Sequence, residues 1–150
     1  MPYQPIKDIP MENLKDKFIK IVLDALDTEI TPQDNVPDEV ACAEVVSTLI
    51  QKVFPDFPIL PSTYELFSKL KLDKRFKATL TPERGCIVVS PRTASVYGHA
   101  GVFITDERIA SNNSAGPLKG QFTGNFTWDT WIKEFIHKRG LRTFIFDIIE

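Results

Sequence analysis

The spacing of apolar residues divides the chain into a helical first half and an extended second half. Apolar side chains recur at helical intervals over residues 11–27, and a second stripe with the same spacing runs over residues 38–53. A third, shorter helix is predicted at residues 62–72, "STYELFSKLKL". Ser62 is placed to cap this helix, and Glu65 stands at the reciprocal position of a capping box. Prolines separate the three segments, because proline removes an amide donor and interrupts a helix.

Beyond residue 74 the pattern changes to short apolar runs bounded by turn residues. The runs "RFKATL", "CIVVSP", "GHAGVFIT" and "RIASNNS" are rich in β-branched and aromatic residues and predict four strands. The "TDER" segment between the last two predicts a tight turn, so those two strands should run antiparallel. Helical spacing returns in "TWDTWIKEFIHK", Gly140 ends that helix, and "RTFIFDII" predicts a last strand. Helices followed by antiparallel strands predict an α+β domain.

Length and composition indicate one globular unit. The 150 residues are enough to bury a core without disulfides or metals, and 43% hydrophobic with 25% charged residues is ordinary for such a chain. The net charge of -2 leaves no basic stripe for nucleic acid. Four cations do cluster between residues 71 and 77, but Asp73 interrupts them, which indicates a solvated face; they are Lys71, Lys74, Arg75 and Lys77. We expect an N-terminal extension with one helix over residues 1–35 and a compact domain over residues 36–150.

The N-terminal segment and the cysteine count set expectations about compartment. The first residues show neither the basic start nor the apolar core of a signal peptide, and no apolar run reaches the about 18 residues of a membrane span. We therefore expect synthesis in the cytoplasm without a leader. Cys42 and Cys86 are expected to stay reduced there. Two cysteines and two histidines lack the paired spacing of a zinc site, so no metal or other cofactor is expected.

Cys42 and His99 are the candidate nucleophile and base. Cys42 lies at the start of the second predicted helix, which Asp38 can cap, and the dipole and amides of a helix N-terminus lower the pKa of a thiol. His99 opens an apolar strand, where an imidazole needs a partner for each ring nitrogen. If the helix packs on the sheet, the thiol can meet the imidazole and form an ion pair. The alternative is that Cys42 is a small buried core residue.

A histidine that acts as a base needs a group that orients its second nitrogen. The strand after "TDER" ends in Ser111, Asn112 and Asn113, next to the beginning of the His99 strand. An asparagine carbonyl there would fix the imidazole tautomer, as in a Cys-His-Asn triad. Alternation does not choose between Asn112 and Asn113, because without the register their faces are unknown. The alternative is a loop end where asparagine bonds its own backbone.

Four other residues with reactive or aromatic side chains receive structural interpretations. Cys86 is interpreted as a buried strand residue and not as a second reactive thiol. His137 lies beside two cations near a helix end and is expected at the surface. Trp128 and Trp131 would line a glycan groove if exposed, but their three-residue spacing on a helix is more typical of core packing.

Four segments of the chain carry a resemblance to a known family: "VACAEVVSTLI", "ERGCIVVSP", "GHAGVFI" and "IASNNSAGPLKGQFTGNFTWDTW". They resemble the NlpC-type and CHAP-type cell-wall peptidases and amidases, which are papain-like cysteine hydrolases. In that family a cysteine opens a helix, and a histidine opens a later strand with the pattern G-H-[VA]-G-[IV]. The resemblance covers about residues 36 to 135, and its last segment is similar to phage-associated members. Its most specific piece is the glycine-histidine strand.

The resemblance implies a papain-like fold with N-terminal helices packed on an antiparallel sheet. It implies Cys42 as nucleophile, His99 as general base and then acid, and Asn112 as the orienting residue, with Asn113 or Ser111 as alternatives. The Cys42 amide would form part of the oxyanion hole. The implied reaction is cleavage of an amide bond in bacterial peptidoglycan, as an endopeptidase or amidase, through a thioester. The enzyme would act at the cell wall after release by a phage holin, as part of a virion, or by injection.

The sequence departs from the family at two positions. Ala41 stands where many members have Asp or Gln, so a side-chain donor to the oxyanion must come from another residue. Cys86 stands where an acidic residue is usual. The rival hypothesis is therefore a catalytically weak or inactive papain-like module that binds or builds a phage virion. A third hypothesis is a protease or acyltransferase with the same triad and a substrate outside the cell wall.

Overall fold

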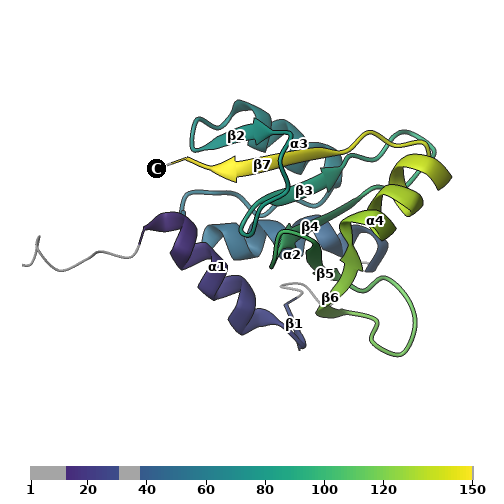
Figure 1. The fold of residues 1–150 in the computed structure, drawn as a ribbon, viewed down its shortest axis with the longest axis horizontal. Helices are drawn as coiled ribbons and strands as arrows, with labels where there is room; N and C mark the ends of the chain where they lie inside the picture. The colour runs from purple at the N-terminus through teal and green to yellow at the C-terminus, as the bar shows by residue number, and fades with distance from the viewer. Residues whose placement is uncertain (1–12, 31–37, 150) are drawn as a thin grey trace, which may run out of the picture.

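The structure, a computed structural model, is an α+β fold built on one antiparallel sheet (Figure 1). It describes residues 13–30 and 38–149, without the side chains of residues 38–40, so the predicted cap at Asp38 lies outside the described side chains. The helices are α1 (Leu14–Ala25), α2 (Asp38–Gln51), α3 (Thr63–Leu72) and α4 (Trp128–Trp131), which continues into the π-helix η2 (Ile132–Lys138). The strands are β1 (Thr28–Glu29), β2 (Phe76–Thr79), β3 (Ile87–Ser90), β4 (His99–Phe103), β5 (Arg108–Asn112), β6 (Gln121–Thr127) and β7 (Phe144–Ile148).

The described strands form a seven-stranded sheet in the order β1-β6-β5-β4-β3-β7-β2, and all its pairings are antiparallel. In Figure 1 the last strand, β7, lies between β2 and β3. The predicted α+β class and the predicted packing of N-terminal helices on an antiparallel sheet are confirmed. None of the helices in the described ranges is long and apolar enough to cross a membrane.

Side chains of the sheet alternate between two cores, as the period of two in a strand requires. The larger core joins one face of the sheet to α1, α2 and α3, and the smaller core joins the opposite face to α4 and η2. Strand β4 shows the division, because Ala100 and Val102 belong to the larger core and Phe103 to the smaller. Residues of β4 that alternate with Ala100 therefore face α4 and η2.

Side-chain caps set where the helices begin. The side-chain oxygen of Asn13 accepts a hydrogen bond from the Asp16 amide at 2.7 Å, so α1 begins at Leu14 and not at residue 11 as its apolar spacing predicts. Ser62 caps α3 as predicted and accepts from the Glu65 amide at 3.1 Å. Thr127 and Thr130 form a capping box that starts α4 directly after β6. Each cap supplies a partner for an amide that the helix itself leaves unpaired.

Three elements differ from the sequence prediction. Strands β1 and β6 were not predicted, and β6 supplies one edge of the candidate site described below. The predicted helix over residues 127–138 is confirmed in position, but from Ile132 onward it winds as a π-helix. Its end is marked by Gly140, which has a φ of +68° and stops the helix as predicted.

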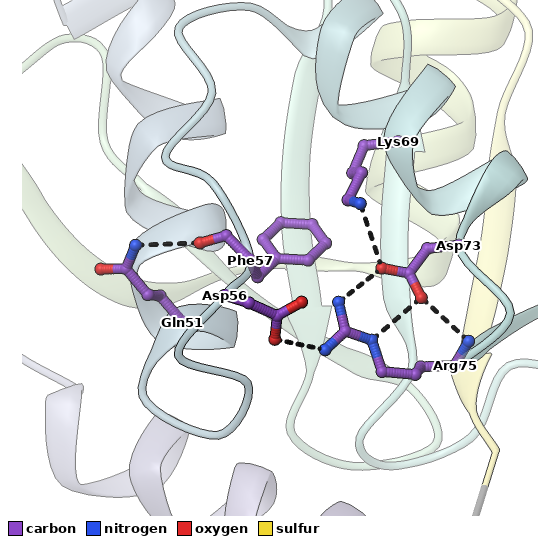
Figure 2. Close-up of polar contacts among 6 residues, drawn as sticks. All are labelled: Gln51, Asp56, Phe57, Lys69, Asp73 and Arg75. Atoms are coloured by element: carbon purple, nitrogen blue, oxygen red, sulfur yellow. Dashed lines mark hydrogen bonds and ion pairs between the residues drawn. The ribbon is translucent and has the colours of Figure 1, made fainter.

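The cationic segment at residues 71–77 holds an ion-pair network that joins α3 to the start of β2 (Figure 2). Arg75 donates to both carboxylate oxygens of Asp73, at 3.0 and 2.7 Å, and to Asp56 at 2.7 Å. Lys69 adds a pair with Asp73 at 3.5 Å. The exposed Lys77 fits the predicted solvated face, whereas Arg75 is half-buried. Hydrogen bonds from Arg75 lower the Asp73 pKa to about 2, well below the ordinary 3.8.

Asp73→Asn is expected to lower the free energy of unfolding by about 2 kcal/mol at pH 7, because ionised Asp73 stabilises the fold. This contribution is complete above the ordinary carboxyl pKa of 3.8 and is lost as the pH falls toward about 2. Urea denaturation at pH 7 and pH 3 measures the difference between the two proteins, which should shrink at the lower pH. Lys77→Ala, an exposed change on β2, is the control. A deficit that stays the same at both pH values would contradict the assignment.

Candidate active site

Two glycines fix the backbone on either side of His99. A Cβ on Gly98 would collide with the carbonyl oxygen of Ser90 and lie 2.6 Å from the amide nitrogen of Arg92. A Cβ on Gly101 would lie 2.7 Å from the carbonyl oxygen of Ala110. No side chain fits at either place, because the obstructing atoms belong to the backbone. Close approach of the β3–β4 connection and of β5 therefore explains the G-H-A-G sequence at the start of β4.

The imidazole of His99 is held in an aromatic cluster on the sheet face covered by α4 and η2. It stacks on Phe135 with ring centroids 5.3 Å apart and an interplanar angle of 15°. Trp131 and Phe126 lie 5.4 and 5.7 Å away, centroid to centroid. His99 is 6% exposed, and its Nε2 lies 2.9 Å from the Ser111 hydroxyl. The ring orientation is therefore fixed by packing and by one hydrogen bond.

A chain of hydrogen bonds, which we call the Ser111 relay, fixes the tautomer of His99. It starts at the backbone carbonyl of Gln121, which can only accept a hydrogen bond, so the side-chain amide nitrogen of Asn113 donates to it at 2.8 Å. The side-chain oxygen of Asn113 then accepts a hydrogen bond from the side-chain nitrogen of Asn125 at 3.1 Å. The side-chain oxygen of Asn125 accepts one from the Ser111 hydroxyl at 2.6 Å. Because the Ser111 hydroxyl uses its one hydrogen to donate to Asn125, it accepts the hydrogen bond that it shares with His99 Nε2. His99 thus carries its proton on Nε2, and Nδ1 is left with a free lone pair.

The register separates the three residues that the sequence leaves open as orienting groups. Ser111 shares a sheet face with His99 and makes the hydrogen bond to it, while Asn113 belongs to the relay. Asn112 faces the other side, with Ala110 and α2. It lines the same pocket as His99, but the described residues give it no hydrogen bond to the imidazole. The orienting role that the resemblance implies for Asn112 stays a prediction, and the observed contact belongs to Ser111.

Cys42 lies in the first turns of α2 with its thiol against the backbone of β4. The backbone amides of Ala100, Ala43 and Cys42 itself form hydrogen bonds with the sulfur. The Ala100 amide belongs to the peptide bond that links His99 to Ala100. The sulfur therefore lies beside the His99 backbone, although no hydrogen bond joins thiol and imidazole among the described residues. These amides lower the thiol pKa as the sequence predicts, but burial outweighs them. The prediction that the Cys42 thiol has a lowered pKa is wrong, because burial raises this pKa to about 11.

Burial acts on the imidazole in the complementary direction. Burial and, to a smaller extent, the Arg139 guanidinium together lower the His99 pKa to about 3. The thiol is 1% exposed, and both groups are neutral at pH 7. The resting pair is therefore a thiol and a neutral imidazole, not the preformed ion pair that the sequence suggests.

A hollow of about 340 Å³, here called the His99 pocket, lies beside the imidazole, and Cys42 is not among the residues that line it. Its polar lining includes His99, Asn112, Asn125, Glu134 and Arg139. Arg139 is fixed by the Glu134 carboxylate at 3.3 Å and by the Tyr97 carbonyl at 3.2 Å. The sequence did not single out Asn125, Glu134 or Arg139. Asn125 stood within the segment that resembles the family, but its place became visible only with β6.

A second hollow of about 570 Å³, here called the α3–β7 pocket, is lined in part by residues that directly follow Arg139 in the sequence. Arg139 lines the His99 pocket, and the next three residues line the α3–β7 pocket. Its floor is apolar and includes Phe67, Phe144 and Phe146. Its lining carries three cations and no carboxylate, and the cations are Lys71, Arg92 and Arg142.

The structural interpretations of the other residues are confirmed. Cys86 is buried, and burial raises its pKa to about 12, so it is an inert thiol. Trp131 is fully buried, as expected of a core residue, whereas Trp128 is half-buried and packs against Phe103 at the edge of the smaller core. His137 is exposed.

Among the described residues, no group of three or more His, Cys, Asp and Glu side chains is placed to hold a metal ion. Both cysteines are free thiols. No protein-family model matches the sequence, and a search of curated proteins finds no match.

Proposed function

We propose that this protein is a papain-like cysteine hydrolase that cleaves an amide bond in bacterial peptidoglycan. Cys42 is the nucleophile, His99 is the base, and Ser111 positions His99. The observation that supports this most strongly is the tautomer, because the Ser111 relay holds the proton on Nε2 and leaves Nδ1 as an acceptor. Thiol catalysis needs a thiol and a base. Here the thiol lies beside the His99 backbone on the α2 face of the sheet, and the imidazole lies on the opposite face. Because His99 is the first residue of β4, the proposal requires the proton to pass around the end of this strand.

The two neutral groups favour a general-base mechanism. As Sγ of Cys42 bonds to the substrate carbonyl carbon, the thiol proton passes to Nδ1 of His99, and the carbonyl oxygen becomes an oxyanion. His99 then returns this proton to the leaving amine as the carbon–nitrogen bond breaks, and a thioester remains. Water adds to the thioester with His99 again accepting a proton. Collapse of this second intermediate breaks the carbon–sulfur bond and returns the proton to the thiol.

The α3–β7 pocket favours an acidic peptide as the part of the substrate bound beside the reacting bond. Lys71 and Arg142 lie over the rings of Phe67 and Phe144, so the cations and the apolar floor form one surface. A stem peptide of peptidoglycan carries free carboxylates on a short chain and fits such a surface by charge. Delivery to the wall by a holin, a virion or injection is proposed on the resemblance alone.

Arg142→Glu is expected to raise KM for peptidoglycan stem peptides about fivefold to tenfold and to leave kcat unchanged. Arg142 is exposed at the rim of the α3–β7 pocket, away from His99, so reversing its charge weakens binding of an acidic substrate without touching the chemistry. Steady-state kinetics on a stem peptide measures both constants. Lys20→Glu makes the same charge change on the exposed side of α1 and should leave KM unchanged. An equal rise of KM in both variants would contradict a local role for the pocket.

The proposed function is tested by digesting purified peptidoglycan with the wild-type protein and analysing the soluble fragments by mass spectrometry. A cysteine amidase or endopeptidase releases fragments with new amine and carboxyl ends and no new reducing sugar ends. Release of reducing ends alone, or no release of fragments, would overturn the proposal.

One observation favours the rival hypothesis of a module that binds without turnover. Cys42 and His99 are both almost completely buried, and burial moves both pKa values away from an ion pair. Such a module would sediment with peptidoglycan and release nothing from it. Sedimentation and fragment release measured on the same sample separate the two functions.

A further inference from the structure

The side chain of Asn112 is buried without a hydrogen-bond partner among the described residues. It is 1% exposed, and neither its Nδ2 nor its Oδ1 has a hydrogen-bond partner in the described structure. Burying a carboxamide in this way is costly, because the group has lost its water and gained nothing. Asn112 also lines the His99 pocket, so a molecule bound there would meet it. Its two empty hydrogen-bonding positions therefore point to a ligand.

The register places Asn112 at the same end of the sheet as the Cys42 thiol. Strands β4 and β5 pair Val102 with Ala110. Two residues further along each strand, Asn112 stands across from Ala100, on the face that packs against α2. The Cys42 thiol lies against the Ala100 amide. Asn112 thus shares its sheet face with the nucleophile, while His99 and Ser111 lie on the other face.

The residues on either side of Cys42 offer no side-chain donor for an oxyanion. Ala41 and Ala43 each end in a methyl group. A tetrahedral intermediate on Cys42 still carries a full negative charge on oxygen, and a preorganised donor aimed at that oxygen lowers the barrier. The backbone amide of Cys42 alone would leave this charge poorly stabilised.

We propose that Asn112 Nδ2 donates a hydrogen bond to the oxyanion formed when Cys42 attacks the substrate. This inference rests on the proposed function and assigns Asn112 a role other than orienting the histidine. It accounts for the missing partner, because the substrate oxygen supplies the acceptor only while the reaction proceeds. It also accounts for the absence of a side-chain donor on the residues next to Cys42.

Two probes separate an oxyanion donor from an orienting residue. The aldehyde N-acetyl-alanyl-glycinal adds to a cysteine thiol and forms a tetrahedral adduct with a charged or hydrogen-bonded oxygen. Iodoacetamide alkylates the same sulfur by displacing iodide and forms no oxyanion. We expect Asn112→Ala to weaken aldehyde binding about 100-fold, measured by calorimetry. Its rate of Cys42 alkylation and the pH profile of that rate should stay within about twofold of wild type.

Ser111→Ala is the matched control on the same strand. It removes the contact to His99 and should change the alkylation rate or its pH profile. Wild-type aldehyde affinity in Asn112→Ala would overturn the inference alone, and so would equal losses toward both probes. Failure of the wild-type protein to form the aldehyde adduct would instead overturn the proposed function, and the inference with it.

A stability measurement checks the same assignment without activity. Asn112→Leu replaces an unpartnered carboxamide by an apolar group of similar size, so Tm is expected to rise by several degrees. A lower Tm in Asn112→Leu would mean that the carboxamide has a structural partner, which would contradict the inference.

Discussion

Cys42→Ala is expected to lower the rate of peptidoglycan solubilisation at least ~10³-fold, because no other described side chain can form the thioester. The only other thiol, Cys86, belongs to the smaller core with Phe103 and Trp131, on the sheet face away from α2. The fold should be retained, since the change removes one buried sulfur from a helix. Turbidity loss of purified peptidoglycan, followed by mass analysis of the fragments, measures the effect.

Cys86→Ala is the matched control for Cys42→Ala. It makes the same chemical change at an equally buried thiol, and it should leave the solubilisation rate within about twofold of wild type. Equal activity of Cys42→Ala and wild type would remove the nucleophile assignment. Equal loss in both variants would show that the fold, and not the chemistry, depends on these sulfurs.

The sequence predicts the elements that carry the site better than it predicts the contacts within it. The His99 strand, its antiparallel neighbour and the helix with Cys42 all follow from apolar spacing and turn residues, and all three are confirmed. The choice among Ser111, Asn112 and Asn113 needed the register, which places Ser111 on the same face as His99. The register depends on pairing across the sheet, which no local pattern specifies.

Strand β6 shows why part of the site stayed hidden. Its sequence "QFTGNFT" alternates, but the ladder to β5 shifts register between Ile109 and Ser111, and this irregularity interrupts the period of two. Asn125 lies on this irregular part of β6, so its bond to Ser111 was not predictable. The prediction of a lowered Cys42 pKa is wrong for a different reason. A helix terminus is visible in sequence, whereas the burial that outweighs it arises only when α2 packs on the sheet.

His99→Gln is expected to abolish turnover and to change how stability depends on pH. Glutamine has no group that accepts the Cys42 proton, so solubilisation of peptidoglycan should fall by about the same factor as in Cys42→Ala. Wild-type His99 has a pKa of about 3 when folded and about 6.5 when unfolded, so between these values only the unfolded chain binds the proton. The free energy of unfolding should therefore fall as the pH drops below 6.5, by up to about 1.4 kcal/mol per pH unit.

Urea denaturation at pH 7.5 and pH 5 isolates this contribution. Wild type should lose about 2 kcal/mol more than His99→Gln between the two values, since the variant has no proton to bind at this position. His137→Gln is the matched control, because His137 is exposed. It should keep both the wild-type activity and the wild-type pH dependence.

If His99→Gln shows the wild-type pH dependence, the imidazole is not held neutral by burial, and the general-base mechanism loses its starting state. If it unfolds at pH 7.5, the imidazole serves mainly as a strut of the aromatic cluster around Phe135 and Trp131.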